Sequence, residues 1–200
     1  IIFTDAQDYS VFLKYLKEYL EPKDEKGLYQ RLSDETIGYQ EKDKILKLLK
    51  LNNFAEEINL LAFSLMPNHF HLLIQQIESK SMDCFLNSLM TRYASYFNRR
   101  QKRVGVLFQD VYKAVLVESE PQLLHLSRYI HRNPLELGEE FSGHQELYSS
   151  LPEYFDKRKT GWVKPQIILD YFSKKNRRNS YAAFVEENDD FEFLKTIVIE

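Results

Sequence analysis

The chain is poor in cysteine and in long apolar runs. Of its 200 residues only Cys84 is a cysteine, which excludes an internal disulfide and a zinc site made of cysteines alone. The longest apolar stretch, around Ile58 to Met66, is far shorter than the roughly 20 residues that span a bilayer. No signal-peptide pattern opens the chain. We therefore expect a cytoplasmic protein without a membrane partner, in which Cys84 is a small buried residue.

A net positive charge is also missing. The formal net charge is −3, which argues against indiscriminate binding to DNA, although net charge averages over faces that can differ. Between Ser88 and Arg132 the balance reverses, because the only acidic residues there are Asp110, Glu118 and Glu120. The basic residues of this segment are Arg92, Arg99, Arg100, Lys102, Arg103, Lys113, Arg128 and Arg132.

Aromatic residues alternate with these cations, and they have two interpretations. Cations beside exposed rings suit single-stranded nucleic acid, whose phosphates meet the charges while unstacked bases meet the rings. The same rings could instead be the core-facing stripe of a helix. They are Tyr93, Tyr96, Phe97, Phe108 and Tyr112.

Two of the five histidines, His69 and His71, lie one residue apart within an apolar run. The preceding Met66-Pro67-Asn68 is a break, so we expect a strand to begin near His69. Side chains alternate across a strand, which places both imidazoles on one face. They could hold a metal ion together, or they could merely pack at a strand edge, because a bare pair of this kind is weakly specific.

A second segment, Pro121 to Asn133, has apolar residues at helical spacing. Proline suits the first turn of a helix, and Pro134 discourages its continuation, so the sequence predicts one helix of about three turns. Tyr129 and Asn133 are four residues apart and share a face. A phenol that can act as a nucleophile and an amide oxygen that can bind a metal thus point the same way. His125, four residues before Tyr129, and His131, two residues after it, straddle that face imperfectly at ideal helical spacing, and we do not propose them as ligands.

The remaining pattern predicts an α+β fold, with helices packed on an antiparallel sheet. A first amphipathic helix includes Tyr9 and Leu20, and residues 21–40 form a polar connection. The further predicted elements are a helix from Lys42 to Leu51, a strand from Ile58 to Leu65 that forms a hairpin with the His-bearing strand, a helix from Ser81 to Arg103 and a strand from Val111 to Val117. Residues 143–200 form a loop and two short helices, and we divide the chain into a domain at 1–142 and a helical C-terminal extension at 143–200.

Three blocks of sequence together resemble a known family. They are FSLMPNHFHLLI, MTRYASYFNRRQKRVGVLFQDVYKAVLVES and LLHLSRYIHRNPLELG, in this order. The chain resembles the single-tyrosine transposases of the HUH superfamily, and among them the REP-associated tyrosine transposases, from about Phe3 to about Phe184. The resemblance implies an HUH endonuclease core, ferredoxin-like or RRM-like, with His69, His71 and Asn133 as metal ligands and Tyr129 as nucleophile.

The chain departs from the family pattern at two places. The family usually opens with a strand carrying a Tyr-His-x-x-x-Arg-like pattern, whereas this chain begins with Ile1-Ile2-Phe3, so we expect that its first strand is missing. Where the family tends to have Gly-Arg, this chain has Asp110-Val111, which removes one arginine expected to contact phosphate. The second departure bears on DNA affinity and full activity and leaves the metal and nucleophile positions intact.

The resemblance implies a metal-dependent reaction on single-stranded DNA. A site of two imidazoles and one amide oxygen suits Mg²⁺ or Mn²⁺. Tyr129 would cut the strand beside a hairpin, a REP-like palindrome, forming a covalent 5′-phosphotyrosine that a second DNA end can reverse. The protein would act as a monomer or a homodimer. Tyr93 or Tyr96 is the alternative nucleophile.

Two other functions compete with this one. In the first, the site is catalytically impaired and the protein only binds hairpin nucleic acid. In the second, His69 and His71 serve an unrelated metal hydrolase, whose turnover would survive the loss of Tyr129.

Overall fold

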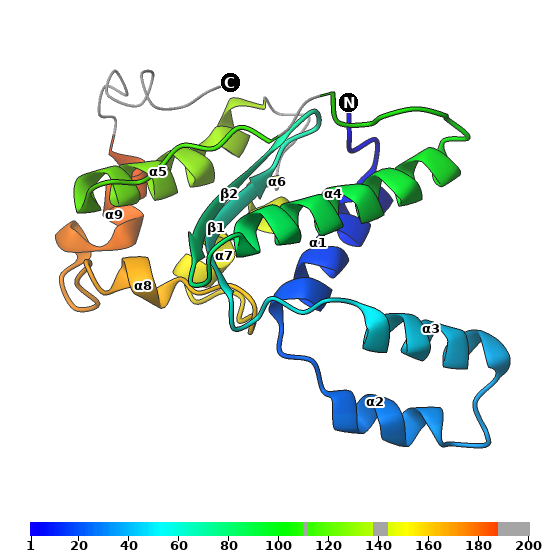
Figure 1. Ribbon diagram of the computed structural model, residues 1–200. Helices are drawn as coiled ribbons and strands as arrows, with labels where there is room; N and C mark the ends of the chain where they lie inside the picture. The colour runs from blue at the N-terminus through cyan, green and yellow to red at the C-terminus, as the bar shows by residue number, and fades with distance from the viewer. Residues whose placement is uncertain (110–111, 138–143, 188–200) are drawn as a thin grey trace.

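The computed structural model describes residues 1–109, 112–137 and 144–187. A two-stranded antiparallel hairpin lies at its centre, with β1 at Ile58–Leu65 and β2 at Phe70–Gln76 (Figure 1). Helices α1 (Ala6–Leu20) and α4 (Ser81–Arg100) cover one face, and α5 (Glu120–Arg132) covers the other. The predicted mixture of helices with an antiparallel sheet is confirmed. The ferredoxin-like HUH core stays a prediction.

The hairpin closes at a tight turn, where the Met66 N–H donates to the His69 carbonyl oxygen at 2.9 Å. A β-bulge interrupts the pairing, because Leu60 pairs with Ile74 and Ala62 pairs with Leu73. Leu61 is the extra residue, so it and Ala62 both face α5, while the residues on either side of them face α1 and α4. The bulge thus puts two consecutive residues of β1 on the face toward α5.

The core between the hairpin and helices α1 and α4 is built largely from aromatic rings. Phe12 contacts Phe70 of β2 at 5.0 Å between ring centroids and Tyr93 of α4 at the same distance. The edge of β1 that does not pair with β2 meets the C-terminal segment, through bridges from Leu60 to Val163 and from Ser64 to Ser149. The other completely buried large side chains of this core are Leu16, Tyr19, Leu20, Ile58, Phe63, Leu65, Phe85 and Leu89.

The second core lies between the hairpin, α5 and the C-terminal helices. Ile130 of α5 and Leu73 of β2 are buried there together with Tyr154 and Tyr181. The C-terminal helices are α6 (His144–Tyr148), α7 (Leu151–Tyr154), α8 (Gln166–Leu169) and α9 (Tyr181–Glu186), with a 3-10 turn at Arg177–Asn179. The sequence predicted two short helices in this region, fewer than the four α-helices that the described residues form. The division of the chain at residues 142 and 143 stays a prediction.

Helices α2 (Glu25–Leu32) and α3 (Tyr39–Lys50) form an arm that projects from the rest of the molecule (Figure 1). The sequence predicted α3 but treated residues 21–40 as a connection. Asp24 explains the difference, because its carboxylate accepts from the Gly27 N–H at 2.9 Å and caps α2. The arm leaves and rejoins the core at one place, where Lys23 donates to the Leu51 carbonyl oxygen at 2.6 Å.

Three further expectations were wrong in part. Residues 112–117 form no strand, and Val111 lies outside the described residues. Helix α4 ends at Arg100 rather than Arg103, because Lys102 takes a left-handed conformation with φ of 50°. Cys84 is exposed rather than buried. Within the part of the chain that the structure describes, no helix has the length and apolarity needed to cross a membrane.

Candidate active site

The hairpin brings the two predicted metal-binding histidines together. His69 lies directly before β2 and His71 is its second residue, so strand alternation puts both rings on the face toward α5. The two Nε2 atoms are 3.1 Å apart. Asn68 fixes the tautomer of His69, because its side-chain oxygen can only accept, and lies 2.8 Å from the His69 Nδ1. The His69 Nε2 therefore carries a lone pair.

Helix α5 brings Asn133 to the same point. The helix begins at a Ser119 cap with proline in its first turn, and its last bond runs from the Asn133 N–H to the Tyr129 carbonyl oxygen. Asn133 keeps helical dihedrals, with φ of −47° and ψ of −45°, although a proline follows it. A 3-10 helix, Asn133–Glu136, continues from there and holds this conformation. The Asn133 amide nitrogen lies 3.3 Å from the His71 Nε2.

With the Asn133 amide nitrogen toward His71, these three polar groups cannot all be satisfied by one another. If the His71 Nε2 carries a proton it can donate to His69, but the amide N–H of Asn133 then faces a donor. If the His71 Nε2 carries a lone pair it can accept from Asn133, but it then faces the lone pair of His69. Burial, with a smaller effect of His69, lowers the pKa of His71 to about 4, so a proton on both ring nitrogens is not available near neutral pH.

A divalent cation fits this arrangement. Two imidazole nitrogens bound to one ion at about 2.1 Å, at right angles, are about 3 Å apart, close to the 3.1 Å found here. Neutral imidazoles are the form that binds metal. Rotation of the Asn133 amide by 180° exchanges its nitrogen for its oxygen, a suitable third ligand. Among the described residues there is no cluster of three His, Cys, Asp or Glu side chains, and the group found beside the two imidazoles is the Asn133 amide.

The tyrosine predicted as nucleophile lies beside these predicted ligands. The ring of Tyr129 meets the ring of His71 edge to face, with centroids 5.5 Å apart. Tyr129 is one helical turn before Asn133, which places phenol and amide on the same side of α5. The structure thus brings together all four residues predicted for metal binding and nucleophilic attack.

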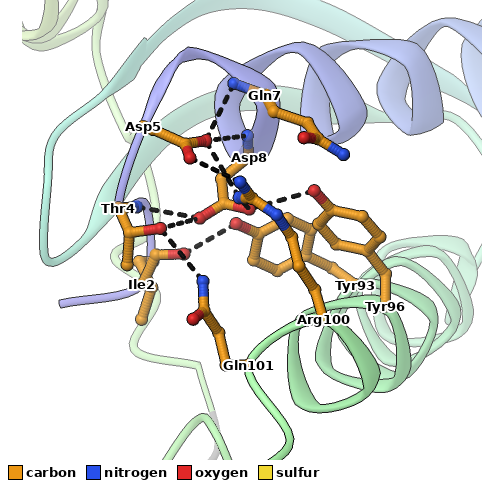
Figure 2. Close-up of polar contacts among 9 residues, drawn as sticks. All are labelled: Ile2, Thr4, Asp5, Gln7, Asp8, Tyr93, Tyr96, Arg100 and Gln101. Carbon is orange, nitrogen blue, oxygen red and sulfur yellow. Dashed lines mark hydrogen bonds and ion pairs between the residues drawn. The ribbon is translucent and has the colours of Figure 1, made fainter.

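The alternative nucleophiles lie on the other face of the hairpin, and Figure 2 shows their hydroxyls directed at residues near the start of α1. Tyr93 is completely buried and donates to the Ile2 carbonyl oxygen at 2.6 Å, and burial raises its pKa. Tyr96 donates to Asp8 at 3.0 Å, and burial and this hydrogen bond raise its pKa to about 12. Both rings belong to the packing of α4 against α1, as the core-stripe interpretation expected.

Two of the eight predicted DNA-binding cations form ion pairs between α4 and α1. Arg100 binds the carboxylates of Asp5 and Asp8, and Asp8 is completely buried (Figure 2). Arg92 pairs with Glu18 at 2.5 Å and stacks on the ring of Tyr15. Such buried or stacked pairs leave a guanidinium little capacity for a phosphate.

Two further cations, both on α5, contact α9 and the residue after it. Arg128 is 1% exposed and donates to the Phe184 carbonyl oxygen at 3.2 Å. Arg132 donates to the Glu187 carbonyl oxygen at 2.6 Å. The remaining predicted cations are Arg99, Lys102, Arg103 and Lys113, which are exposed. Asp110 and Val111, the departure from the family pattern, lie outside the described residues.

The other histidines of α5 lie away from this site. His131 is completely buried, with Nδ1 2.7 Å from the Tyr181 hydroxyl and Nε2 2.7 Å from the Ser150 hydroxyl. The Nδ1 of His125 accepts from Arg128 at 2.9 Å. Sequence reasoning did not predict the contact of Asn68 with His69 or that of Ser150 with His131. Asn68 directly precedes His69 and could have been considered, whereas no local signal links Ser150 to α5.

One comparison identifies a relationship to known proteins. The family model described as "Transposase IS200 like" matches residues 33–133, about half of the chain, including His69, His71, Tyr129 and Asn133. No curated protein and no solved structure matches the chain significantly.

Proposed function

Because the chain belongs to the family of IS200-like transposases, we propose that it cuts and rejoins single-stranded DNA through a covalent phosphotyrosine. Family membership implies a transposase that cleaves DNA. The finer proposal is a REP-associated tyrosine transposase that acts beside hairpins with a divalent metal, Mg²⁺ or Mn²⁺. It is carried by one observation, the placement of Tyr129 next to the converging Nε2 atoms of His69 and His71.

His69, His71 and Asn133 would hold the metal ion. When bound, the ion neutralises charge on the scissile phosphate and makes the phosphorus more open to attack. In neutral His69 the Asn68 oxygen holds the proton on Nδ1 and leaves the lone pair on Nε2, and burial keeps His71 neutral at neutral pH.

Tyr129 would supply the nucleophile. Its phenol oxygen forms a bond to phosphorus while the bond from phosphorus to the 3′ oxygen breaks, and the phenol proton leaves as the 3′ oxygen gains one. The products are a 5′-phosphotyrosine and a free 3′-hydroxyl. The phosphoester is conserved, so a second 3′-hydroxyl can attack the adduct and join strands without ATP. Helix α5 would hold the phenol and Asn133 one turn apart throughout.

The exposed cations would bind the DNA backbone. Arg99, Lys102 and Arg103 lie at or just after the end of α4, outside the ion pairs that hold α4 to α1. Cations of this kind position phosphates without reading sequence. We therefore assign them, with Lys113, to DNA binding, and assign Arg92, Arg100 and Arg128 to the stability of the fold.

A covalent adduct tests the proposal. The full chain, a Tyr129→Phe variant and a Tyr171→Phe control are incubated with labelled single-stranded DNA from the flanks of the gene, with Mn²⁺ or EDTA. A denaturing protein gel should show a labelled, Mn²⁺-dependent band with the unaltered chain and the control, and none with Tyr129→Phe. Tyr171 suits the control because it is an exposed tyrosine whose hydroxyl bonds Glu120, at the far end of α5.

The other outcomes separate the competing functions. A shift in a native gel without any adduct would indicate a protein that binds hairpin DNA but does not cut it. Cleaved DNA without an adduct, unchanged in the Tyr129→Phe variant, would indicate a metal hydrolase.

A further inference from the structure

A buried chain of hydrogen bonds connects α5 to the hairpin on one side and to α9 on the other. His131 is at its centre. On the hairpin side, the Phe63 N–H of β1 donates to the Ser150 hydroxyl at 2.8 Å, and that hydroxyl lies 2.7 Å from the His131 Nε2. On the other side, the His131 Nδ1 lies 2.7 Å from the Tyr181 hydroxyl.

The direction of every bond follows from the partners. Tyr181 donates to the Ser127 hydroxyl at 3.1 Å, and Ser127 donates to the Leu124 carbonyl oxygen at 2.7 Å. The Tyr181 oxygen must therefore accept from His131, which makes Nδ1 the protonated nitrogen. Nε2 then accepts from Ser150. The Ser150 hydroxyl also lies 3.3 Å from the Phe63 carbonyl oxygen, but its shorter bond of 2.7 Å is the one to Nε2. With these directions the chain is satisfied by the neutral Nδ1–H tautomer.

His131 lies midway between the two functional residues of α5, two positions after Tyr129 and two before Asn133. A residue two positions away points to a different side of the helix, so His131 cannot reach the metal ligands that Tyr129 and Asn133 face. It can instead fix how far α5 is rotated about its axis and how far it is shifted along β1. Phe63, the other end of this connection, pairs with Leu72, next to His71 in β2.

We propose that His131 is a positioning residue, which sets the placement of Tyr129 and Asn133 relative to His69 and His71 through the Ser150 and Tyr181 hydroxyls. The inference rests on the proposed function. It makes the C-terminal segment part of the working nuclease, since Ser150 precedes α7 and Tyr181 begins α9, both beyond the residues that the family model matches.

Removal of single hydroxyls tests this role with little loss of packing. In Tyr181→Phe and Ser150→Ala the rate of adduct formation at saturating DNA and Mn²⁺ should fall at least about tenfold, because displacement of a reacting group by about 1 Å can cost 100-fold. The dissociation constant for DNA should change less than about twofold. Tyr171→Phe is the matched control, because Tyr171 also bonds α5, through Glu120 at 3.2 Å, but at the exposed end. It should keep the native rate.

Replacement of the ring itself distinguishes positioning from general stability. His131→Phe keeps a ring but removes both hydrogen bonds, whereas His131→Gln keeps a donor and an acceptor and should recover part of the rate. All rates are measured well below the melting temperature of each variant, where a purely structural defect leaves the folded fraction and the rate unchanged. Binding of Mn²⁺ alone, followed by electron paramagnetic resonance, should weaken in His131→Phe because Asn133 is displaced.

The results distinguish a failure of the positioning role of His131 from a failure of the proposed function. Native rates in both Tyr181→Phe and Ser150→Ala, with native Mn²⁺ binding in His131→Phe, would overturn the positioning role and leave the proposed function intact. Absence of any adduct with the unaltered chain, together with Mn²⁺ binding that survives His71→Ala, would overturn the proposed function and with it the role of His131.

Discussion

Replacement of His131 by phenylalanine should change how stability depends on pH. Burial lowers the pKa of His131 to about 3, whereas histidine in an unfolded chain has a pKa of about 6.5. The unfolded state therefore binds the proton more readily at intermediate pH. The contribution of the neutral His131 to stability is fully present above pH 6.5 and is lost progressively as the pH falls toward 3.

The expected size follows from linkage. A histidine protonated in the unfolded state and neutral in the folded state contributes a slope of about 1.4 kcal/mol per pH unit. Between pH 7 and pH 4.5 this amounts to about 3 kcal/mol. His131→Phe should lose about 1–3 kcal/mol at pH 7, because the hydroxyls of Ser150 and Tyr181 lose a partner. The variant lacks the contribution of neutral His131 that is lost at acid pH. By pH 4.5 its free energy of unfolding should therefore equal or exceed that of the unaltered chain.

Urea unfolding at several pH values between 7 and 4.5, in EDTA, measures both curves. Trp162, the single tryptophan, is buried against Phe63 and reports unfolding by fluorescence. His71 also has a lowered pKa, but it is present in both proteins and cancels in their difference. The carboxyls of Asp5 and Asp8 have lowered pKa values, so their contribution is lost only below about pH 4. Parallel curves, with a gap constant to within about 0.5 kcal/mol, would refute the reasoning.

Four further substitutions test the roles assigned to single side chains. Arg100→Gln should lower the free energy of unfolding by about 3 kcal/mol, because it leaves the buried Asp8 carboxylate without its cation. Lys102→Gln should leave stability unchanged but lower the slope of log affinity for DNA against log salt concentration by about 0.7. Equal salt slopes for Lys102→Gln and the unaltered chain would contradict this assignment. Ser64→Ala should be neutral or stabilising in urea unfolding, since the Ser64 hydroxyl is buried and has no hydrogen-bond partner among the described residues. A loss above about 1 kcal/mol would show that the hydroxyl has a role. Asn68→Ala should weaken Mn²⁺ binding about 10- to 100-fold, measured by electron paramagnetic resonance, because the His69 tautomer is no longer fixed; unchanged binding would remove Asn68 from the site.

Local patterns predicted the elements that position the site. β1 begins and ends where its apolar run predicted, and α5 begins within one residue of its predicted start because serine and proline mark its first turn. The spacings of His69 with His71 and of Tyr129 with Asn133 each predicted a shared face. The contact between these two faces depends on how α5 packs on the hairpin, and the residue spacing within either segment does not predict it.

Other expectations failed because they depended on partners distant in sequence. Residues 112–117 are rich in apolar and β-branched side chains, but a strand also needs a neighbour to pair with, and the described residues provide none there. Arg100 and Arg128 looked like part of a basic cluster. Their partners, Asp8 and Phe184, lie more than 50 residues away, so only the folded chain shows that these charges are already engaged.

The arm formed by α2 and α3 has a consequence for how such proteins can diversify. Its entry and exit adjoin each other, because Lys23 reaches the Leu51 carbonyl oxygen and the Asn53 amide reaches that of Glu21. A segment anchored at one point can be lengthened, shortened or exchanged without moving the hairpin or α5. Relatives could therefore acquire different arms while their chemistry stays fixed. For the same reason, the loop between α2 and α3 is the place to insert a fluorescent label or an affinity tag.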